Sequence, residues 1–177
     1  MRVLLTEGSS TSARQAITAL ALAGHEVAYC DPARICLGRF SRLVVRRYRC
    51  PPLGTDPEGF RHFLHETLSR ERFDVLLPIH EQGYLVARLA DELRPRVAFA
   101  VPAFESYERV LTKLGFRGLL TELGLQQPPT HLLDDPRSLA QHAAYPFVVK
   151  AALGTASRST WLIRCEADRD RAAAELA

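Results

Sequence analysis

A lysine ends one of the most apolar segments of the chain. Lys150 follows "PFVV" and precedes the loop "LGTASRST", residues 153–160. We expect the strand before it to be buried on both faces, and because burial of an unpaired ammonium group is costly, Lys150 must either reach solvent or meet an anion. Small residues let backbone N–H groups approach a phosphate, and this loop also carries hydroxyl groups and Arg158. The pattern predicts a nucleotide phosphate beside Lys150.

A second lysine stands at the start of a predicted helix. Thr112 is a suitable N-cap, so Lys113 would lie in the first turn of the helix that runs to Leu123. A cation there opposes the helix dipole, at a cost of about a few tenths of a kcal/mol. A phosphate bound at the same helix end would instead be attracted by both the dipole and the lysine. Lys113 is therefore a second candidate phosphate ligand, and the alternative is an ordinary surface lysine.

An acidic residue follows a predicted strand in the first half of the chain. Glu81 comes directly after His80, beyond the strand "VLLPI". Open α/β sheets bind ligands at the carboxyl ends of their strands, so Glu81 is a candidate substrate contact. The alternative is an acid at a helix N-terminus, where the dipole favours it.

The first turn, "TEGSSTSA", lies where a dinucleotide-binding loop would lie. The fingerprint of such a loop is G-x-G-x-x-G, and only Gly8 is present. Asp31 ends the second predicted strand, where an acid would bind a ribose. An NAD(P)-dependent oxidoreductase domain is therefore one alternative, and a purely structural turn is another.

A basic segment, "FSRLVVRRYRC", contains Arg42, Arg46, Arg47 and Arg49 around Tyr48. Basic residues with an aromatic between them can bind nucleic acid. A charged edge strand or a subunit contact explains the segment equally well. The net charge of the chain is only +3, which does not favour nucleic acid or an anionic membrane as a partner.

The order of predicted elements indicates two parts. Residues 1–103 alternate between strands and helices, which predicts a Rossmann-like parallel sheet. The expected strands are 2–6, 25–31, 73–79 and 97–102, and the expected helices are 13–24, 56–71 and 81–93. The alternation then stops, and residues 104–177 predict a helical pair ending at Gly124, a short helix at 138–145, a hairpin of 146–152 with 159–165, and a final helix.

Composition is that of a globular protein, with 47% hydrophobic and 24% charged residues. No apolar segment approaches the ~20 residues of a membrane span, and the N-terminus lacks the core of a signal peptide. The cysteines, at positions 30, 36, 50 and 165, form no metal-binding pattern and are expected to be reduced. These features predict a cytoplasmic protein that does not bind membranes.

Taken together, "LTKLGFRGLLTELGLQQPPT" and "PFVVKAALGTASRSTWLI" resemble the ATP-grasp enzymes, and the resemblance covers the whole chain. It is similar to the N-terminal portion of the family: a Rossmann-like pre-ATP-grasp domain at 1–103 and the beginning of an ATP-grasp domain, with an antiparallel lid hairpin, at 104–177. The acid of "LLPIHE" makes it most similar to carbamoyl-phosphate synthase. Ala151 stands where relatives have proline, and the loop has a single glycine.

The resemblance implies an ADP-forming ligase that activates a carboxylate as an acyl phosphate for attack by an amine or similar nucleophile. Lys113 and Lys150 would contact the phosphates of ATP, and the loop would close over them through Gly154, Thr155, Ala156 and Ser157. Magnesium would be bound by carboxylates further along than this chain, which would therefore be inactive alone. A non-catalytic nucleotide-binding module is the remaining alternative, and a homodimer is compatible with the resemblance.

Overall fold

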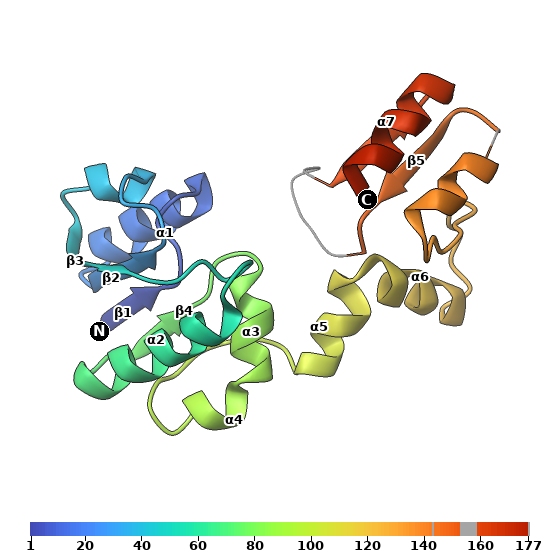
Figure 1. Cartoon of the computed structure of the whole chain (residues 1–177). Helices are drawn as coiled ribbons and strands as arrows, with labels where there is room; N and C mark the ends of the chain where they lie inside the picture. The colour runs from blue at the N-terminus through green and yellow to red at the C-terminus, as the bar shows by residue number, and fades with distance from the viewer. Residues whose placement is uncertain (143, 153–158, 177) are drawn as a thin grey trace. The chain divides into compact units, whose positions relative to one another are not determined.

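The computed structural model describes residues 1–142, 144–152 and 159–176. The chain divides into two compact units, Met1–Phe104 and Glu105–Ala177, and each is described by itself (Figure 1).

The first unit is built on a four-stranded parallel sheet. Its strands are β1 (Arg2–Leu5), β2 (Glu26–Asp31), β3 (Val44–Arg49) and β4 (Val75–Leu77). Their order is β3-β2-β1-β4, and every pair is parallel. This arrangement confirms the predicted Rossmann-like sheet, and it places the basic segment on an edge strand.

Helices cover both faces of this sheet (Figure 1). They are α1 (Thr11–Leu22), α2 (Pro57–Arg70), α3 (Gln82–Arg88) and α4 (Ala90–Leu93), with a short 3-10 helix, η1, at Leu37–Phe40. Alternate residues of β1 enter two separate cores: Val3 and Leu5 pack with Ile17 of α1, whereas Leu4 packs with Phe60 and Leu64 of α2. A strand buried on both faces is expected in a parallel sheet.

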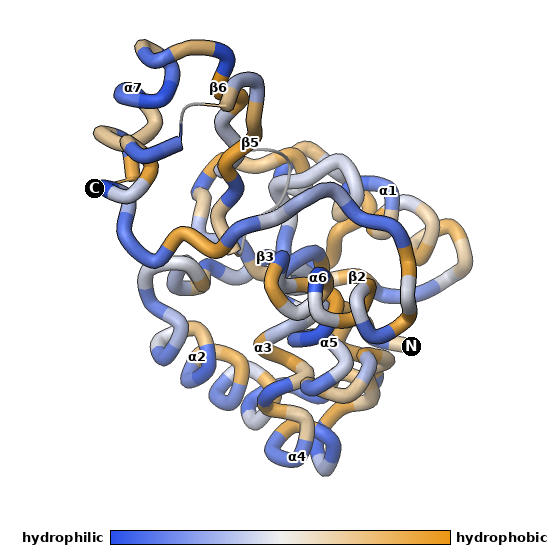
Figure 2. Tube along the Cα trace, turned by 90° about the vertical axis from the view of Figure 1, so that its right-hand side faces the viewer, coloured by the Kyte–Doolittle hydropathy of each residue, from blue (hydrophilic) through white to orange (hydrophobic). Residues whose placement is uncertain are grey.

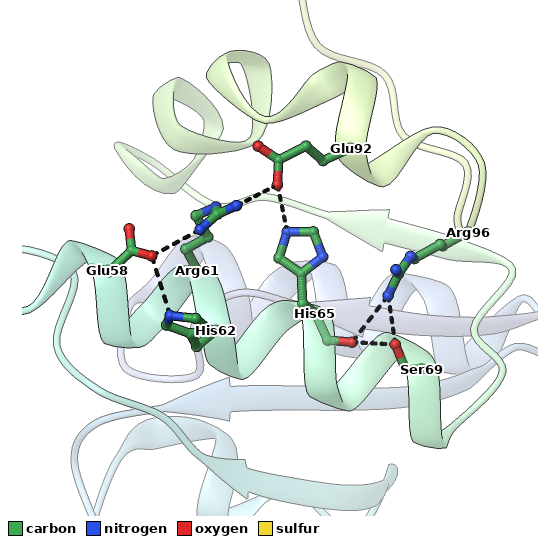
Figure 3. Close-up of polar contacts among 7 residues, drawn as sticks. All are labelled: Glu58, Arg61, His62, His65, Ser69, Glu92 and Arg96. Carbon is green, nitrogen blue, oxygen red and sulfur yellow. Dashed lines mark hydrogen bonds and ion pairs between the residues drawn. The ribbon is translucent and has the colours of Figure 1, made fainter.

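Helix α2 has one face in the core and the opposite face in solvent. Asp56 caps it by accepting from the N–H of Gly59 at 2.8 Å, and Pro57 is its first residue, as the sequence predicts. Hydrophobic and hydrophilic residues alternate along it (Figure 2), so that one face enters the core. On the other face, Arg61 lies between Glu58 at 2.8 Å and Glu92 of α4 at 2.9 Å (Figure 3).

Some predicted boundaries in the first unit are wrong. Residues 97–102 form no strand: the segment makes only an isolated bridge between Ala98 and Val75. The helix predicted at 81–93 is two helices, α3 and α4, which meet at Leu89. Helix α1 begins at Thr11 rather than at residue 13, because Ser10 caps it: the Ser10 side chain accepts from the N–H of Ala13 at 3.0 Å.

The second unit consists of short elements. They are α5 (Phe104–Leu111), α6 (Lys113–Glu122), the 3-10 helix η2 (Pro136–Gln141), β5 (Phe147–Lys150), β6 (Thr160–Ile163) and α7 (Glu166–Leu176). Strands β5 and β6 pair antiparallel, which confirms the predicted hairpin. The core consists of Leu139, Ile163 and Ala172 with half-buried aromatic residues around them. Trp161 also donates to Glu175 at 2.7 Å, which ties α7 to β6.

Two expectations for this unit fail. The short helix predicted at 138–145 is a 3-10 helix that ends at Gln141. Strand β5 is not buried on both faces: Phe147 and Val149 are half-buried, whereas Val148 and Lys150 are exposed. Among the described residues, no helix combines the length and the apolar character that crossing a membrane requires.

Candidate functional site

The two candidate phosphate-binding lysines are brought together by a backbone hydrogen bond. The N–H of Lys113 donates to the carbonyl of Ala152 at 2.9 Å, and Ala152 lies two residues beyond Lys150. The N-terminus of α6 is thereby tied to the end of β5. The backbone at Lys113 therefore lies beside the segment that follows Lys150, an arrangement that is compatible with a shared phosphate site.

The start of α6 is fixed by side chains that the sequence supplies locally. Thr112 accepts from the N–H of Gly115 at 2.9 Å and donates to the carbonyl of Glu108 at 2.8 Å. A Cβ at Gly115 would lie 2.5 Å from that same carbonyl oxygen, which is too close for any side chain. Thr112 and Gly115 thus set the sharp step from α5 to α6 that places Lys113 in the first turn.

Lys150 lies on the exposed face of the hairpin. Its neighbour across the hairpin is Thr160, and the same face carries Val148 opposite Leu162, which are 50% and 48% exposed. The ammonium group is not buried, so the cost of burial does not require an anion here. What remains in favour of phosphate is position, because Lys150 stands beside a helix N-terminus that already carries Lys113.

The predicted phosphate loop, Gly154, Thr155, Ala156 and Ser157, lies outside the described residues. Its role stays a prediction.

Lysine and arginine occur in very unequal numbers in this chain. The chain contains 21 arginines but only two lysines, and these are Lys113 and Lys150. The two residue types are not interchangeable, since a lysine presents a compact point charge on a flexible stem and an arginine a planar fork. Lysine therefore occurs at the two positions where a phosphate contact is predicted, and every other residue of the Lys/Arg type is an arginine.

Glu81 lies at the carboxyl edge of the sheet in the first unit. It immediately precedes α3, and the preceding residue, His80, has a φ of 50°, an uncommon conformation for a non-glycine residue. His80 Nδ1 lies 3.2 Å from a carboxylate oxygen of Glu7, which the sequence reasoning missed. Glu7 lies two residues beyond the end of β1, so the position of an acid near the carboxyl end of a neighbouring strand could have identified it.

The turn after β1 is held by Asp31, which is 2% exposed. Its carboxylate accepts from the N–H of Gly8 at 2.9 Å, the hydroxyl of Ser9 at 2.7 Å and the N–H of Ala33 at 2.7 Å. Gly8 itself lies against Tyr29, where a Cβ would be 2.5 Å from the ring. Because these groups occupy the carboxylate, Asp31 is a structural residue and gives no support to ribose binding.

Comparison with solved structures identifies the fold. The L-amino acid ligase from Bacillus licheniformis matches with a TM-score of 0.76 at 18% identity, over 99% of this chain and 42% of that protein. The biotin carboxylase domain of 2-oxoglutarate carboxylase from Hydrogenobacter thermophilus, solved with MgADP, matches with a TM-score of 0.65 at 19% identity, over 96% and 39%. N5-carboxyaminoimidazole ribonucleotide synthetase from Thermotoga maritima matches with a TM-score of 0.56 at 17% identity, over 96% of this chain and 43% of that protein.

These proteins share the ATP-grasp architecture, so the predicted resemblance to the N-terminal portion of ATP-grasp enzymes is confirmed at the level of the fold. The chain spans less than half the length of each of the three. No protein-family model matches the sequence, and no match was found among curated proteins.

Proposed function

We propose that the protein is an ATP-dependent, ADP-forming ligase in which Lys113 and Lys150 contact the phosphates of ATP. The observation that carries the proposal is the hydrogen bond from the Lys113 N–H to Ala152, which joins the N-terminus of α6 to the segment after Lys150. This contact supports the proposal because two lysines on joined backbone segments, one of them at a helix N-terminus, would favour a polyphosphate.

The substrate of the proposed reaction is a carboxylate, activated as an acyl phosphate and then attacked by an amine or similar nucleophile. The matched proteins support the class, since they include an amino acid ligase and a carboxylase. Glu81, at the carboxyl edge of the sheet, is proposed to contact the substrate. The closer similarity to carbamoyl-phosphate synthase stays a prediction.

The described residues contain no group of three His, Cys, Asp or Glu side chains that could hold a metal ion. Magnesium is expected as the companion of ATP, but the residues described do not fit a magnesium site. The part proposed for this chain is to bind and orient the phosphates.

The proposal can be tested with an acyl phosphate derivative of ATP on the full-length protein. A lysine amine next to the phosphates attacks the acyl carbonyl, forms an amide and releases ATP. Because only two lysines lie in these 177 residues, peptide mass spectrometry resolves each one. We expect both Lys113 and Lys150 to be acylated, and excess ATP to suppress the labelling.

The Lys150→Arg variant is the matched control, since it keeps the charge but cannot form the amide. It should leave Lys113 labelled. Absence of labelling at both lysines, or labelling that excess ATP does not reduce, would contradict the proposed site. Labelling without ADP formation in the presence of candidate carboxylates would instead favour a non-catalytic nucleotide-binding module.

A further inference from the structure

A small pocket lies beside the edge strand of the first unit. Its volume is about 170 Å³, and it is lined by Tyr29, Ala33, Arg34, Arg39, Arg47, Tyr48 and Arg49. Since a water molecule occupies about 30 Å³ in the liquid, the pocket has room for only a few water-sized groups. Four of the residues that line it are arginines, drawn from β3, from η1 and from the loop before it.

The register of β3 divides the basic segment between the two faces of the sheet. Arg47 pairs with Tyr29 and Arg49 with Asp31, whereas Arg46 pairs with Ala28. Paired residues on neighbouring strands project to the same face, and successive residues project to opposite faces. Arg47 and Arg49 therefore share the face of Tyr29, and Arg46 lies on the face covered by α2.

Arg46 has a structural role on its own face. It forms an ion pair with Glu71 at 2.8 Å, and its guanidinium lies over the ring of Tyr48, 5.3 Å from the centroid. Similarly, Arg61 on α2 is held between two carboxylates (Figure 3). These arginines have their charge compensated by the protein itself.

The pocket arginines differ in this respect. Arg39 donates to the carbonyl of Arg34 and Arg47 to the carbonyl of Ser41, each at 3.3 Å. Within the described part of the chain, none of the four pocket arginines forms an ion pair. Carbonyl groups satisfy single N–H donors but leave the positive charge uncompensated.

Asp31, the strand partner of Arg49, carries a carboxylate on this face. It is buried and already accepts from Gly8, Ser9 and Ala33. These hydrogen bonds of Asp31 are therefore made to backbone and hydroxyl groups and not to the pocket arginines. Mutual repulsion among these guanidinium groups favours an anion between them.

We propose that this pocket binds a small molecule carrying at least two negative charges on phosphate or carboxylate groups. The planar fork of arginine matches both groups, and two adjacent forks can bind one such group bidentately. Tyr29 also lines the pocket; its hydroxyl accepts from Cys36 Sγ at 3.2 Å, and burial together with Cys36 raises its pKa above the usual value, so it adds no negative charge. The pocket volume excludes a folded nucleic acid as the ligand that fills it.

The proposal is independent of the ATP site, because the two share no residue. Isothermal titration calorimetry with pyrophosphate and with tricarballylate, at constant ionic strength, distinguishes a phosphate ligand from a carboxylate ligand. We expect one of them to bind, and the Arg47→Gln/Arg49→Gln double variant to bind it at least about tenfold more weakly. The titrations are made in the Lys113→Ala/Lys150→Ala background, in which the proposed ATP site can no longer hold pyrophosphate, so that the binding that remains is assigned to the pocket.

The matched control is Arg46→Gln/Arg70→Gln, which removes the same net charge outside the pocket and should change affinity less than about twofold. Thermal melts establish that each variant is folded, and Arg34→Gln, in the exposed loop, provides a second test that should weaken binding about threefold or more. Equal losses in the control and pocket variants, or no binding of either anion while the pocket arginines are unchanged, would overturn the proposal. So would a single-stranded oligonucleotide that binds more tightly than both anions and is equally sensitive to the pocket variants.

Discussion

The two units of the molecule differ in how their elements are held. In the first unit, the sheet lies between two cores, and Leu4 and Leu5 of one strand are each fully buried on opposite faces. Among the described residues of the second unit, the core has Leu139, Ile163 and Ala172 at its centre, and no residue of α5 or α6 is buried. Packing in the two cores stabilises the first unit. In the second unit, the position of the α6 N-terminus depends instead on the hydrogen bonds made by Thr112 and by the N–H of Lys113.

This difference bears on where binding occurs. The candidate lysines belong to the weakly packed unit, and hydrogen bonds from Thr112 and to Ala152 set their positions. The arginine pocket belongs to the scaffold, where strand register sets the positions of its residues. Substitutions of buried residues in the first unit should therefore lower the free energy of unfolding more than substitutions at the start of α6.

The largest effect is expected from Phe60→Ala. The ring is 1% exposed in the core beneath α2, so its removal should cost about 3–5 kcal/mol of unfolding free energy. Chemical denaturation with hydrogen exchange should locate the loss in residues 1–104. Phe40→Ala is the control, because that ring is 68% exposed and its loss should change stability by less than about 0.5 kcal/mol. A cost below about 1 kcal/mol for Phe60 would refute the account of this core.

A smaller effect is expected from Asp31→Asn. The amide has one oxygen to accept with, and its NH₂ group would face donors now held by the carboxylate. The cost should be about 2–3 kcal/mol, measured by denaturation. Asp91→Asn, at an exposed position of α4, should cost only a few tenths of a kcal/mol, about the size of a helix-dipole effect. Equal effects of the two substitutions would show that Asp31 does not hold the turn.

The third prediction concerns Thr112→Ala in the second unit. Loss of the N-cap should cost about 1 kcal/mol, and hydrogen exchange should speed up in the first turn of α6 while unit 1 is unaffected. Thr121→Ala is the matched control, since its hydroxyl donates to the carbonyl of Arg117 and accepts from Gln127, both away from the first turn of α6. Exchange that stays unchanged in Thr112→Ala would mean that packing, not the cap, holds the start of α6.

The smallest effect concerns pH. The Tyr48 hydroxyl, together with Arg46 and Arg2, lowers the pKa of Glu71 below its usual 4.5. The folded state therefore favours the ionised form, and this contribution to stability is full above pH 4.5 and is lost as the pH falls through the lowered pKa. Melting temperatures of the unmodified protein and Glu71→Gln should converge on acidification. A gap that stays constant or widens would contradict the assignment.

The sequence predicted the elements whose signals are local. The βαβ order, the Asp56–Pro57 start of α2, the Thr112 cap and the antiparallel hairpin all depend on neighbouring residues. The predicted strand at 97–102 failed because β propensity depends on the partner: Ala98 bridges to Val75, but the rest of the segment has no ladder.

The sites depend on contacts that local patterns do not contain. The hydrogen bond from Lys113 to Ala152 joins residues far apart in the sequence. The division of the arginines between two faces depends on a register shift between Val27 and Ala28, which leaves Val45 without a partner. Alternation alone could not show that Arg46 is structural and that Arg47 and Arg49 line a pocket.

The most direct test of the proposed ATP site is calorimetric titration of the full-length protein with ATP·Mg and with adenosine. If Lys150 contacts the phosphates, Lys150→Ala should weaken ATP binding at least about tenfold and leave adenosine binding unchanged. Unchanged affinity for ATP, or an equal loss for both ligands, would contradict the account.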